Sequence, residues 1–301
     1  MGLFFRRIRI GGRFPFIRLI QVRDNPLYLL HMAVKNLVFK REPVAKYRDR
    51  YAAMTFLSGQ QTLEDLITHG KSLARFSDGE FEMITGAGIY PPDSDWCQRW
   101  SKPLVKDLLA ALSSADPRLL VAVDPPETFL GERDSVHPIP FEYNMWIDMR
   151  RLMWRYLRPG RSYGHCHLFL RTNCPDLNWS QLREFFRDRD VIIATGNTHK
   201  LSHLVLGRRN FFIECGTEHA YEKKERIKAD IRALITRENL DRSNTLVLAS
   251  LGATAPILAH QLLDEGICVW DTGHMFEFAA SGFIESVFDQ AGAPEQKQGT
   301  I

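Results

Sequence analysis

Two carboxylates flank a single glycine in residues 75–81, which read R-F-S-D-G-E-F. Asp78 and Glu80 carry like charges, which repel unless a cation lies between them or water solvates each one separately. Hard divalent ions such as Mn²⁺ and Mg²⁺ prefer oxygen ligands and commonly take one or two carboxylates together with substrate phosphates. Gly79 permits a turn that directs both carboxylates to one ion. The alternative is a solvated turn in which Asp78 caps the following helix and Glu80 favours the helix dipole.

Two further segments place polar residues directly after an apolar run. Residues 248–256 read L-A-S-L-G-A-T-A-P, in which a strand leads through Gly252 to a helix with Pro256 in its first turn. Such a glycine lets a phosphate approach, and a helix N-terminus offers N–H groups to an anion, although an ordinary strand-to-helix turn has the same pattern. Residues 271–274 read D-T-G-H. His274 could be a metal ligand, a general base or a structural side chain bonded to the backbone.

The apolar pattern of the chain predicts which elements position these residues. Several short runs consist of consecutive Val, Ile, Leu and Phe residues, as in strands of a parallel sheet that is buried on both faces. Helical patterns alternate with these runs, which indicates an α/β protein with a Rossmann-like, mostly parallel sheet and helices on both faces. The predicted strands cover residues 71–76, 118–124, 166–171, 190–196, 210–215, 244–250 and 267–273, and the predicted helices cover 26–40, 62–69, 101–114, 141–157, 178–188, 220–235 and 253–266.

Residues at helix ends sharpen these boundaries. Thr62 is expected to cap the N-terminus of one helix and Gly70 to end it. Ser101 is expected to cap the next helix, with Pro103 in its first turn. In an open parallel sheet, ligands bind outside the carboxyl ends of the strands. We therefore expect a polar edge made of the residues that follow the strands, at 75–80, 124–126, 171, 195–197, 250–254 and 271–274.

Charge is distributed unevenly along the 301 residues. Residues 1–50 contain 12 Lys or Arg and 3 Asp or Glu, a net charge of +9 in a chain whose total is +3. In residues 1–25 the arginines alternate with apolar residues, which suits either an anionic membrane surface or a packed or disordered arm. Arginines interrupt every apolar stretch, so neither a signal peptide nor a transmembrane helix is predicted. The basic residues lack an aromatic platform or a known motif, so nucleic-acid binding is not expected.

The chain has five cysteines, an odd number, and their spacing is irregular. This pattern is expected for free thiols in a reducing compartment. We therefore expect a cytoplasmic protein that could lie on the inner face of the plasma membrane. Three parts are predicted along the chain: a basic, partly helical N-terminal arm at 1–58, one α/β domain at 59–285, and a disordered tail at 286–301.

Over about residues 60–280, the order of these motifs resembles the bacterial glycosyltransferases of the GT-D fold. That family has motifs that read roughly R-F-x-D-G-E, L-G-x-T-A and D-x-G-H, which match R-F-S-D-G-E, L-G-A-T-A and D-T-G-H here. The strand-and-arginine segment G-H-C-H-L-F-L-R and the strand D-V-I-I-A-T-G-N fall between them. Two departures stand out: Ser77 replaces a glycine that usually precedes the acid, and H-C-H at 165–167 replaces a small residue that is often followed by Asn.

The resemblance implies a metal-dependent glycosyltransferase that uses a UDP-sugar donor in bacterial surface-glycan assembly. The acceptor would be a glycan, glycolipid or glycoprotein. By this resemblance Asp78 and Glu80 hold Mn²⁺ or Mg²⁺ against the donor diphosphate and are catalytic. His274, Glu277 or Asp271 is the base, and His274 is favoured as the base or as a residue close to the metal. The implied donor-binding residues are Arg75, Arg171, Thr195, Gly196, Asn197, Gly252, Thr254 and Asp271.

Three other interpretations remain open at this point. The same sheet could serve a non-catalytic sugar-nucleotide-binding module of a glycan assembly complex. The D-P-P run at 124–126 resembles the catalytic loop of adenine-type methyltransferases, but the aromatic residue expected after it is absent. A zinc protein is suggested by His199 and His203, four residues apart. No Glu directly follows His199, and the H-C-H run at 165–167 lies on a predicted strand, so core or surface histidines are the simpler explanation.

Overall fold

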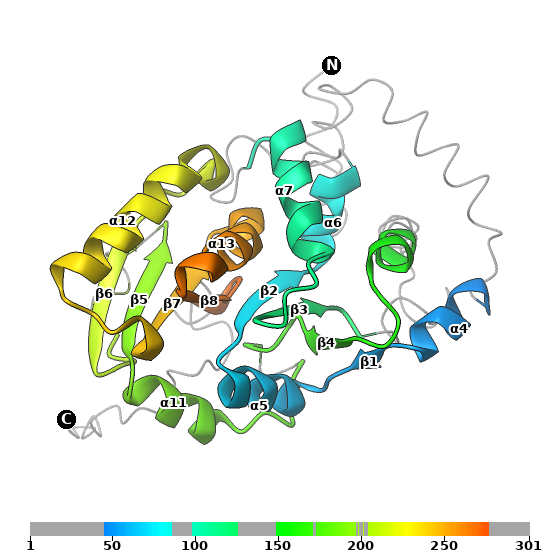
Figure 1. Ribbon diagram of the computed structural model, residues 1–301, viewed down its shortest axis with the longest axis horizontal. Coiled ribbons are helices and arrows are strands. Elements are labelled where there is room, and N and C mark those ends of the chain that lie inside the picture. The colour runs from blue at the N-terminus through cyan, green and yellow to red at the C-terminus, as the bar shows by residue number, and fades with distance from the viewer. Residues whose placement is uncertain are drawn as a thin grey trace, which may run out of the picture.

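The computed structural model describes residues 45–85, 98–125, 149–170, 173–196, 198, 201 and 204–276 (Figure 1). The helix predicted at 26–40 and the tail predicted at 286–301 lie outside these residues. Within them the chain forms one eight-stranded sheet in the order β1-β4-β3-β2-β8-β7-β5-β6. The strands are β1 (Thr55–Phe56), β2 (Ser72–Phe76), β3 (Leu119–Val123), β4 (Ser162–His165), β5 (Asp190–Thr195), β6 (Arg209–Glu214), β7 (Thr245–Ser250) and β8 (Cys268–Asp271).

Every strand pairing in the described residues is parallel. The helices are α4 (Ala45–Ala52), α5 (Gly59–His69), α6 (Asp78–Thr85), α7 (Lys102–Leu112), α11 (Trp179–Arg187), α12 (Lys224–Arg237) and α13 (Ala255–Gln261). Residues 149–156 are also helical. Short 3₁₀ turns are η2 (Ala220–Lys223), η3 (Arg242–Asn244), η4 (Gly252–Thr254) and η5 (Leu263–Glu265). The predicted fold class, a parallel α/β sheet, is confirmed.

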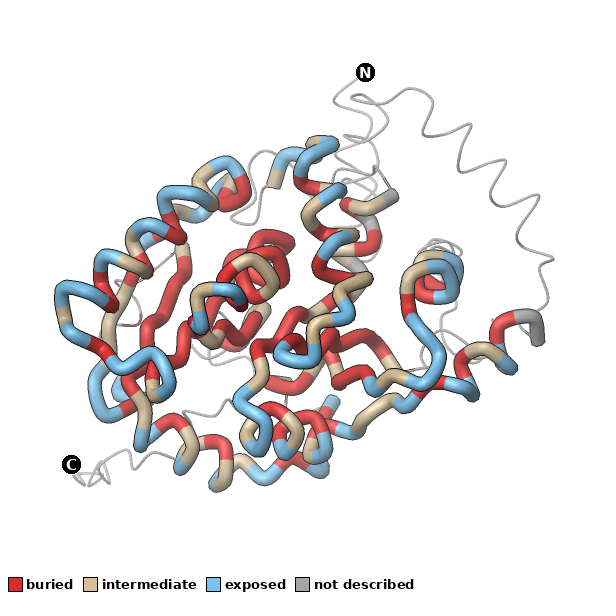
Figure 2. The backbone as a smooth tube through the Cα atoms, in the orientation of Figure 1, coloured by how far each residue is buried: buried red, intermediate tan, exposed pale blue. Residues whose placement is uncertain are grey.

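Successive side chains of each strand point into two separate apolar layers. Val121 and Val247 pack with α7, α12 and α13 on one face, whereas Leu120 and Leu248 pack with α5 and α11 on the other. Figure 1 shows these two helix groups above and below the sheet, and Figure 2 shows the central strands as a continuous buried band. Uninterrupted apolar strands therefore arise because both faces of this sheet are covered.

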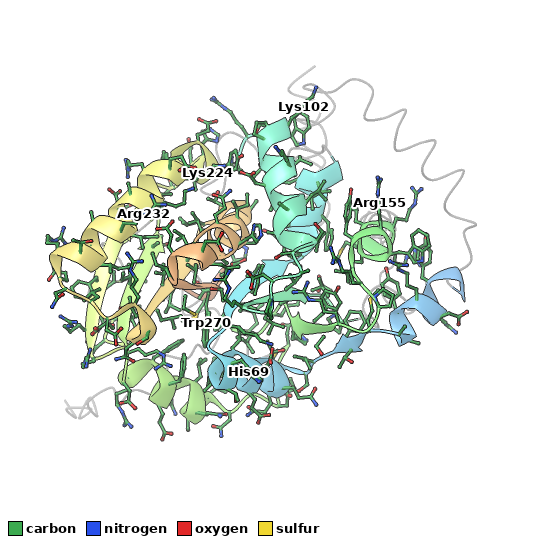
Figure 3. All side chains as sticks on the ribbon, viewed as in Figure 1. His69, Lys102, Arg155, Lys224, Arg232 and Trp270 are labelled. Atoms are coloured by element: carbon green, nitrogen blue, oxygen red, sulfur yellow. The ribbon has the colours of Figure 1, made fainter. Side chains whose placement is uncertain are left out.

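Trp270 anchors the lower layer at the middle of the sheet, near the centre of Figure 3. Its indole stacks on Phe185 of α11, with ring centroids 5.1 Å apart. Its Nε1–H donates to the Lys71 carbonyl at 2.9 Å, so the polar atom of this fully buried ring is satisfied. The contact links β8 to the start of β2 and holds together the two strands at the centre of the sheet.

The predicted helix ends are partly confirmed. Gly70, with φ +60°, ends α5, and Ser101 caps α7. The N-cap predicted at Thr62 is wrong, because α5 begins three residues earlier with a capping box between Ser58 and Gln61. The Thr62 hydroxyl instead donates to the Ser58 carbonyl at 2.7 Å and accepts the His165 N–H at 2.9 Å, so it ties α5 to the end of β4.

The strand predicted at 166–171 is wrong. β4 lies four residues earlier, at Ser162–His165, and residues 166–169 form a turn. Cys166, Leu168 and Phe169 are buried in the lower apolar layer without joining the sheet. A short apolar run does not distinguish a strand from another buried segment, and here the turn buries its apolar side chains without a strand partner.

The start of the sheet, the cysteines and the length of the helices bear on three further predictions. β1, which precedes the domain boundary predicted at residue 59, pairs with β4 at the edge of the sheet. Cys166, Cys174, Cys215 and Cys268 are free thiols, as predicted for these four; Cys97 lies outside the described residues. Among the described helices, none is long and apolar enough to cross a lipid bilayer.

Candidate functional site

The strand order brings most of the predicted polar edge together. The carboxyl ends of β4, β3, β2, β8, β7 and β5 follow one another across the sheet. The chain runs outward from β2 to one side through β3 and β4, and it fills the other side with β5 to β8. The boundary between β2 and β8 is therefore the position at which open α/β sheets bind ligands. Neighbouring strands lie about 4.8 Å apart, so the ends of β2 and β5 are separated by roughly 14 Å.

A buried ion pair joins the two strands at this boundary. The Arg75 Nε atom lies 3.4 Å from the Asp271 Oδ1 atom, and the two side chains are 13% and 3% exposed. The Arg75 backbone N–H also donates to Asp271 Oδ2 at 3.3 Å. On the other side, Arg75 Nη1 donates to the Cys166 carbonyl at 2.5 Å. Arg75 therefore braces the ends of β2 and β8 against the turn after β4.

The pKa values of this pair reflect burial and mutual charge. Burial raises the pKa of Asp271, and the Arg75 guanidinium offsets part of that rise. Burial acts to lower the pKa of Arg75, but the negative charges near it, chiefly Asp271 and also Glu80, outweigh burial and raise it. The D-x-E motif lies near this pair because helix α6, which contains it, begins two residues after the end of β2.

Gly273 is required by the packing of Arg75. A β-carbon at this position would lie 1.8 Å from Arg75 Nη2 and 2.5 Å from Cζ. The backbone at Gly273 has φ +52°, in the left-handed region that favours glycine. The Gly273 N–H donates to Asp271 Oδ1 at 3.0 Å. The glycine of D-T-G-H is therefore explained by the close approach of a guanidinium and not by contact with a ligand.

The D-x-E motif opens helix α6, which starts at the end of β2. Ser77 occupies the cap position, because its carbonyl accepts the Phe81 N–H at 3.1 Å. The Glu80 Oε2 atom accepts the Ser77 N–H at 3.1 Å, as the third residue of a capping box does. Asp78 is the first residue of α6, and its side chain lies outside the described part. Glu80 is half-buried, and the bond from Ser77 holds its carboxylate at the end of β2.

The glycine turn after β7 packs beside this helix. α6 contacts η4 as well as β2 and α7. Gly252 has φ +52° and is exposed, and no described atom lies within 4 Å of a β-carbon position, which leaves room for a ligand beside the described residues. Thr254 is fully buried, and its Oγ1 has no hydrogen-bond partner within the part of the chain that the structure describes. The Ser250 hydroxyl lies 2.7 Å from that of Thr272, which joins the ends of β7 and β8.

The remaining residues predicted for the site follow β5 and β8 or lie outside the described residues. Thr195 is buried at the end of β5. Gly196 approaches the chain after β6, since a β-carbon there would lie 2.8 Å from the Gly216 carbonyl oxygen, so packing accounts for this glycine. His274 is half-buried in the turn after β8, next to Gly273. Arg171 and Asn197 lie outside the described residues.

Asp124, which belongs to the polar edge predicted from the sequence, lies next to the site together with Cys166 and His167, which were not assigned to it. Asp124, after β3, accepts a hydrogen bond from the Ser77 hydroxyl at 3.1 Å and lies 2.8 Å from His167 Nε2. Cys166 is fully buried beside them, and its thiol pKa is raised well above the usual value by burial and by the charge of Asp124. The H-C-H run was a signal for this cluster. Its misplacement on a strand concealed that His167 lies in a turn and reaches back to β3.

The comparison with protein families is decisive at this point. Residues 73–280, more than half of the chain, match the model of the family described as the glycosyltransferase GT-D fold. The chain belongs to this family. The match contains the D-x-E motif, the glycine turn after β7 and D-T-G-H.

Curated relatives of this GT-D chain are streptococcal. It is 30% identical over 236 residues to the probable glycosyl transferase Gly of Streptococcus gordonii, covering 74% of this chain and 32% of that protein. It is 25% identical over 226 residues to the glycosyltransferase GlyD of Streptococcus pneumoniae, covering 71% of this chain and 26% of that protein. The chain thus spans about a third or less of the length of these relatives.

Solved structures show the same fold. One, described as a highly conserved domain of unknown function 1792 with a distinct glycosyltransferase fold, superposes with a TM-score of 0.59 at 20% identity, covering 80% of this chain and 86% of that one. Another, described as a new glycosyltransferase from Streptococcus sanguinis, gives a TM-score of 0.57 at 23% identity, covering 76% and 85%.

Proposed function

We propose that this chain is a glycosyltransferase domain that transfers a sugar from a nucleotide donor, a UDP-sugar, to a glycan, glycolipid or glycoprotein acceptor in bacterial surface-glycan assembly. The observation that carries the proposal is the buried Arg75–Asp271 pair at the boundary between β2 and β8. Asp271 belongs to D-T-G-H, the D-x-E motif follows Arg75 at the end of β2, and the η4 turn after β7 contacts helix α6, which contains that motif. Membership of the GT-D family supports the reaction class.

The proposed cofactor is Mn²⁺ or Mg²⁺, held by Asp78 and Glu80. The first turn of α6 suits such an ion because Glu80 presents a half-buried carboxylate beside Asp78 at the edge of the sheet. A carboxylate has lone pairs for several partners, so the hydrogen bond from Ser77 to Oε2 leaves capacity for a cation. When bound, a divalent ion stabilises the negative charge that develops on the departing nucleoside diphosphate.

The protein's own residues are proposed to orient the donor. Arg75 is held rigid by Asp271 and the Cys166 carbonyl, so it fixes the ends of β2 and β8, next to which we propose that the diphosphate binds. The open turn at Gly252 provides backbone room for phosphate oxygens. We propose that the donor extends from there towards the ends of β7 and β5, with Thr195 and Gly196 at the nucleoside. His274, in the turn after β8, is the proposed base for the acceptor hydroxyl.

Nucleotide release from a panel of nucleotide sugars, measured with and without Mn²⁺, tests the reaction class. Asp78→Asn and Glu80→Gln are expected to lower turnover at least about 100-fold, because metal stabilisation of the transition state is worth several kcal/mol. Glu184→Gln, at an exposed position of α11, is the matched control and should retain turnover.

Two results would count against the proposal in different ways. Normal Mn²⁺-dependent turnover by either acid variant would remove the metal assignment. Tight UDP binding without release of nucleotide from any donor would favour the non-catalytic module instead. Calorimetric titration with Mn²⁺ and UDP separates these outcomes, since it measures binding without requiring turnover.

A further inference from the structure

A cluster of three different ligand-type side chains lies beside the D-x-E segment and is not used by the proposed transfer reaction. Asp124 follows β3, and Cys166 and His167 follow β4. These strands pair in parallel, with Val123 opposite His165, so their ends are neighbours. One oxygen, one sulfur and one nitrogen atom from the three side chains all lie within 4.8 Å of one another.

We infer that Asp124, Cys166 and His167 form a binding site for a thiophilic divalent ion of the zinc type, separate from the oxygen-ligand site of Asp78 and Glu80. Zn²⁺ is bound by Cys, His and Asp at about 2.0–2.3 Å, and sites with three protein ligands keep a fourth position for another group. Tetrahedral ligands at these distances lie roughly 3.3–3.7 Å apart. Each atom of the cluster therefore needs to shift by only about 1 Å or less to reach this geometry.

The ligand set distinguishes this site from the neighbouring carboxylates. Thiolate and imidazole favour zinc and similar ions, whereas a pair of carboxylates favours Mg²⁺ and Mn²⁺. One carboxylate, one thiolate and one neutral imidazole also balance the charge of a divalent ion, which suits a buried position. Asp124 and Cys166 are buried, whereas the His167 side chain is 26% exposed. The exposed side of His167 gives the ion a path from solvent.

Surrounding hydrogen bonds already orient the three ligands. Ser77 Oγ donates to Asp124 Oδ2 at 3.1 Å and leaves Oδ1 directed to His167. The His167 N–H donates to His165 Nδ1 at 3.2 Å, which fixes the turn. Arg75 Nη1 holds the Cys166 carbonyl. Such outer partners commonly set ligand orientation in metal sites.

The charge of Arg75 does not oppose an ion at this position. Its guanidinium is paired with Asp271, whose side chain is 3% exposed. Asp271 ends β8, on one side of β2, whereas the cluster follows β3 and β4, on the other side. The competing explanation is a metal-free hydrogen-bond network through Ser77, Asp124 and His167. The two explanations differ in one measurable respect. The metal site predicts that an added ion binds to the Cys166 sulfur, whereas the hydrogen-bond network predicts no such bond.

Titration of the folded, full-length protein with Co²⁺ provides the test, because a thiolate ligand gives an intense near-ultraviolet charge-transfer absorption that oxygen ligands do not. The wild-type protein is expected to show this absorption at one Co²⁺ per chain, and Zn²⁺ should displace the ion. Cys166→Ser should abolish the absorption and weaken Co²⁺ binding at least about tenfold, the scale reached even by losing an outer partner. Cys215→Ser is the matched control, since Cys215 is also buried but lies after β6, where its thiol donates to the Ile213 carbonyl.

Two further variants keep the test decisive. His167→Gln alters a partly exposed ligand and should weaken Co²⁺ binding without unfolding the protein, as checked by circular dichroism. Glu80→Gln should leave the absorption intact, because Glu80 belongs to the metal site proposed for sugar transfer. A failure of that proposed site would therefore lower turnover without changing the Co²⁺ absorption. Absence of the absorption in the wild type, its survival in Cys166→Ser, or its loss in Cys215→Ser would each overturn the inference.

Discussion

Replacing Gly273 by alanine tests the buried brace that organises the candidate site. The new β-carbon would lie 1.8 Å from Arg75 Nη2, and φ at this position is +52°. An L-residue in the left-handed region costs about 1–2 kcal/mol. Overpacking costs a further 1–3 kcal/mol, approximately, where side chains have to shift. We therefore expect Gly273→Ala to lower the free energy of unfolding by about 2–5 kcal/mol in total.

Gly252→Ala is a control that measures only the cost of placing an L-residue at a left-handed backbone position. Gly252 also has φ +52°, but none of the described atoms lies within 4 Å of a β-carbon there. Gly252→Ala should therefore lose only about 1–2 kcal/mol. Urea unfolding followed by circular dichroism gives both free energies from the midpoint and slope of each transition. The difference between the two variants isolates the cost of displacing Arg75 from Asp271.

That difference decides whether the reasoning holds. If the guanidinium moves far enough to leave Asp271 unpaired, the extra cost approaches about 3–5 kcal/mol, as for other broken buried pairs. If the two alanine variants are equally stable within about 0.5 kcal/mol, the guanidinium does not occupy the space beside Gly273. The explanation given for the glycine of D-T-G-H would then be refuted.

Three other predictions concern acid stability, the base and the N-terminal arm. Hydrogen bonds from Arg209 and Arg208 lower the pKa of the buried Asp190 to about 2, so its stabilisation is present above pH 4, approximately, and is lost as pH falls towards 2. Asp190→Asn should cost up to about 2 kcal/mol at neutral pH and flatten the acid part of the stability curve; an unchanged curve in urea unfolding contradicts this. His274→Gln should lower turnover by about 10²–10⁴ while Mn²⁺ binding in calorimetry stays the same, and normal turnover would exclude it as the base. Deleting residues 1–25 should reduce co-sedimentation with anionic vesicles but not donor hydrolysis, because each Lys or Arg near such a surface contributes about 1 kcal/mol; unchanged sedimentation would argue against a membrane role.

The sequence by itself determined the fold class and most elements of the sheet. Strands such as Asp190–Thr195 and Thr245–Ser250 are continuous apolar runs, and that pattern follows directly from burial on both faces. Caps with a local mechanism, such as Ser101 and Gly70, were also predictable, because their hydrogen bonds and backbone angles involve residues close in sequence. The motifs R-F-S-D-G-E, L-G-A-T-A and D-T-G-H pointed to the correct family for the same reason: each is a contiguous segment.

Tertiary structure alone decided which residues meet and why some of them are there. Arg75 and Asp271 are far apart in the chain, and they pair because β2 and β8 are neighbours in the sheet. A local sequence pattern does not predict which strands are neighbours. The cluster of Asp124, Cys166 and His167 depends on β4 ending at His165, whereas the apolar run 166–171 indicated a strand. A local pattern reports which side chains prefer to be buried. Only the packed sheet fixes which strand ends lie together, because that order is set by contacts between segments distant in sequence.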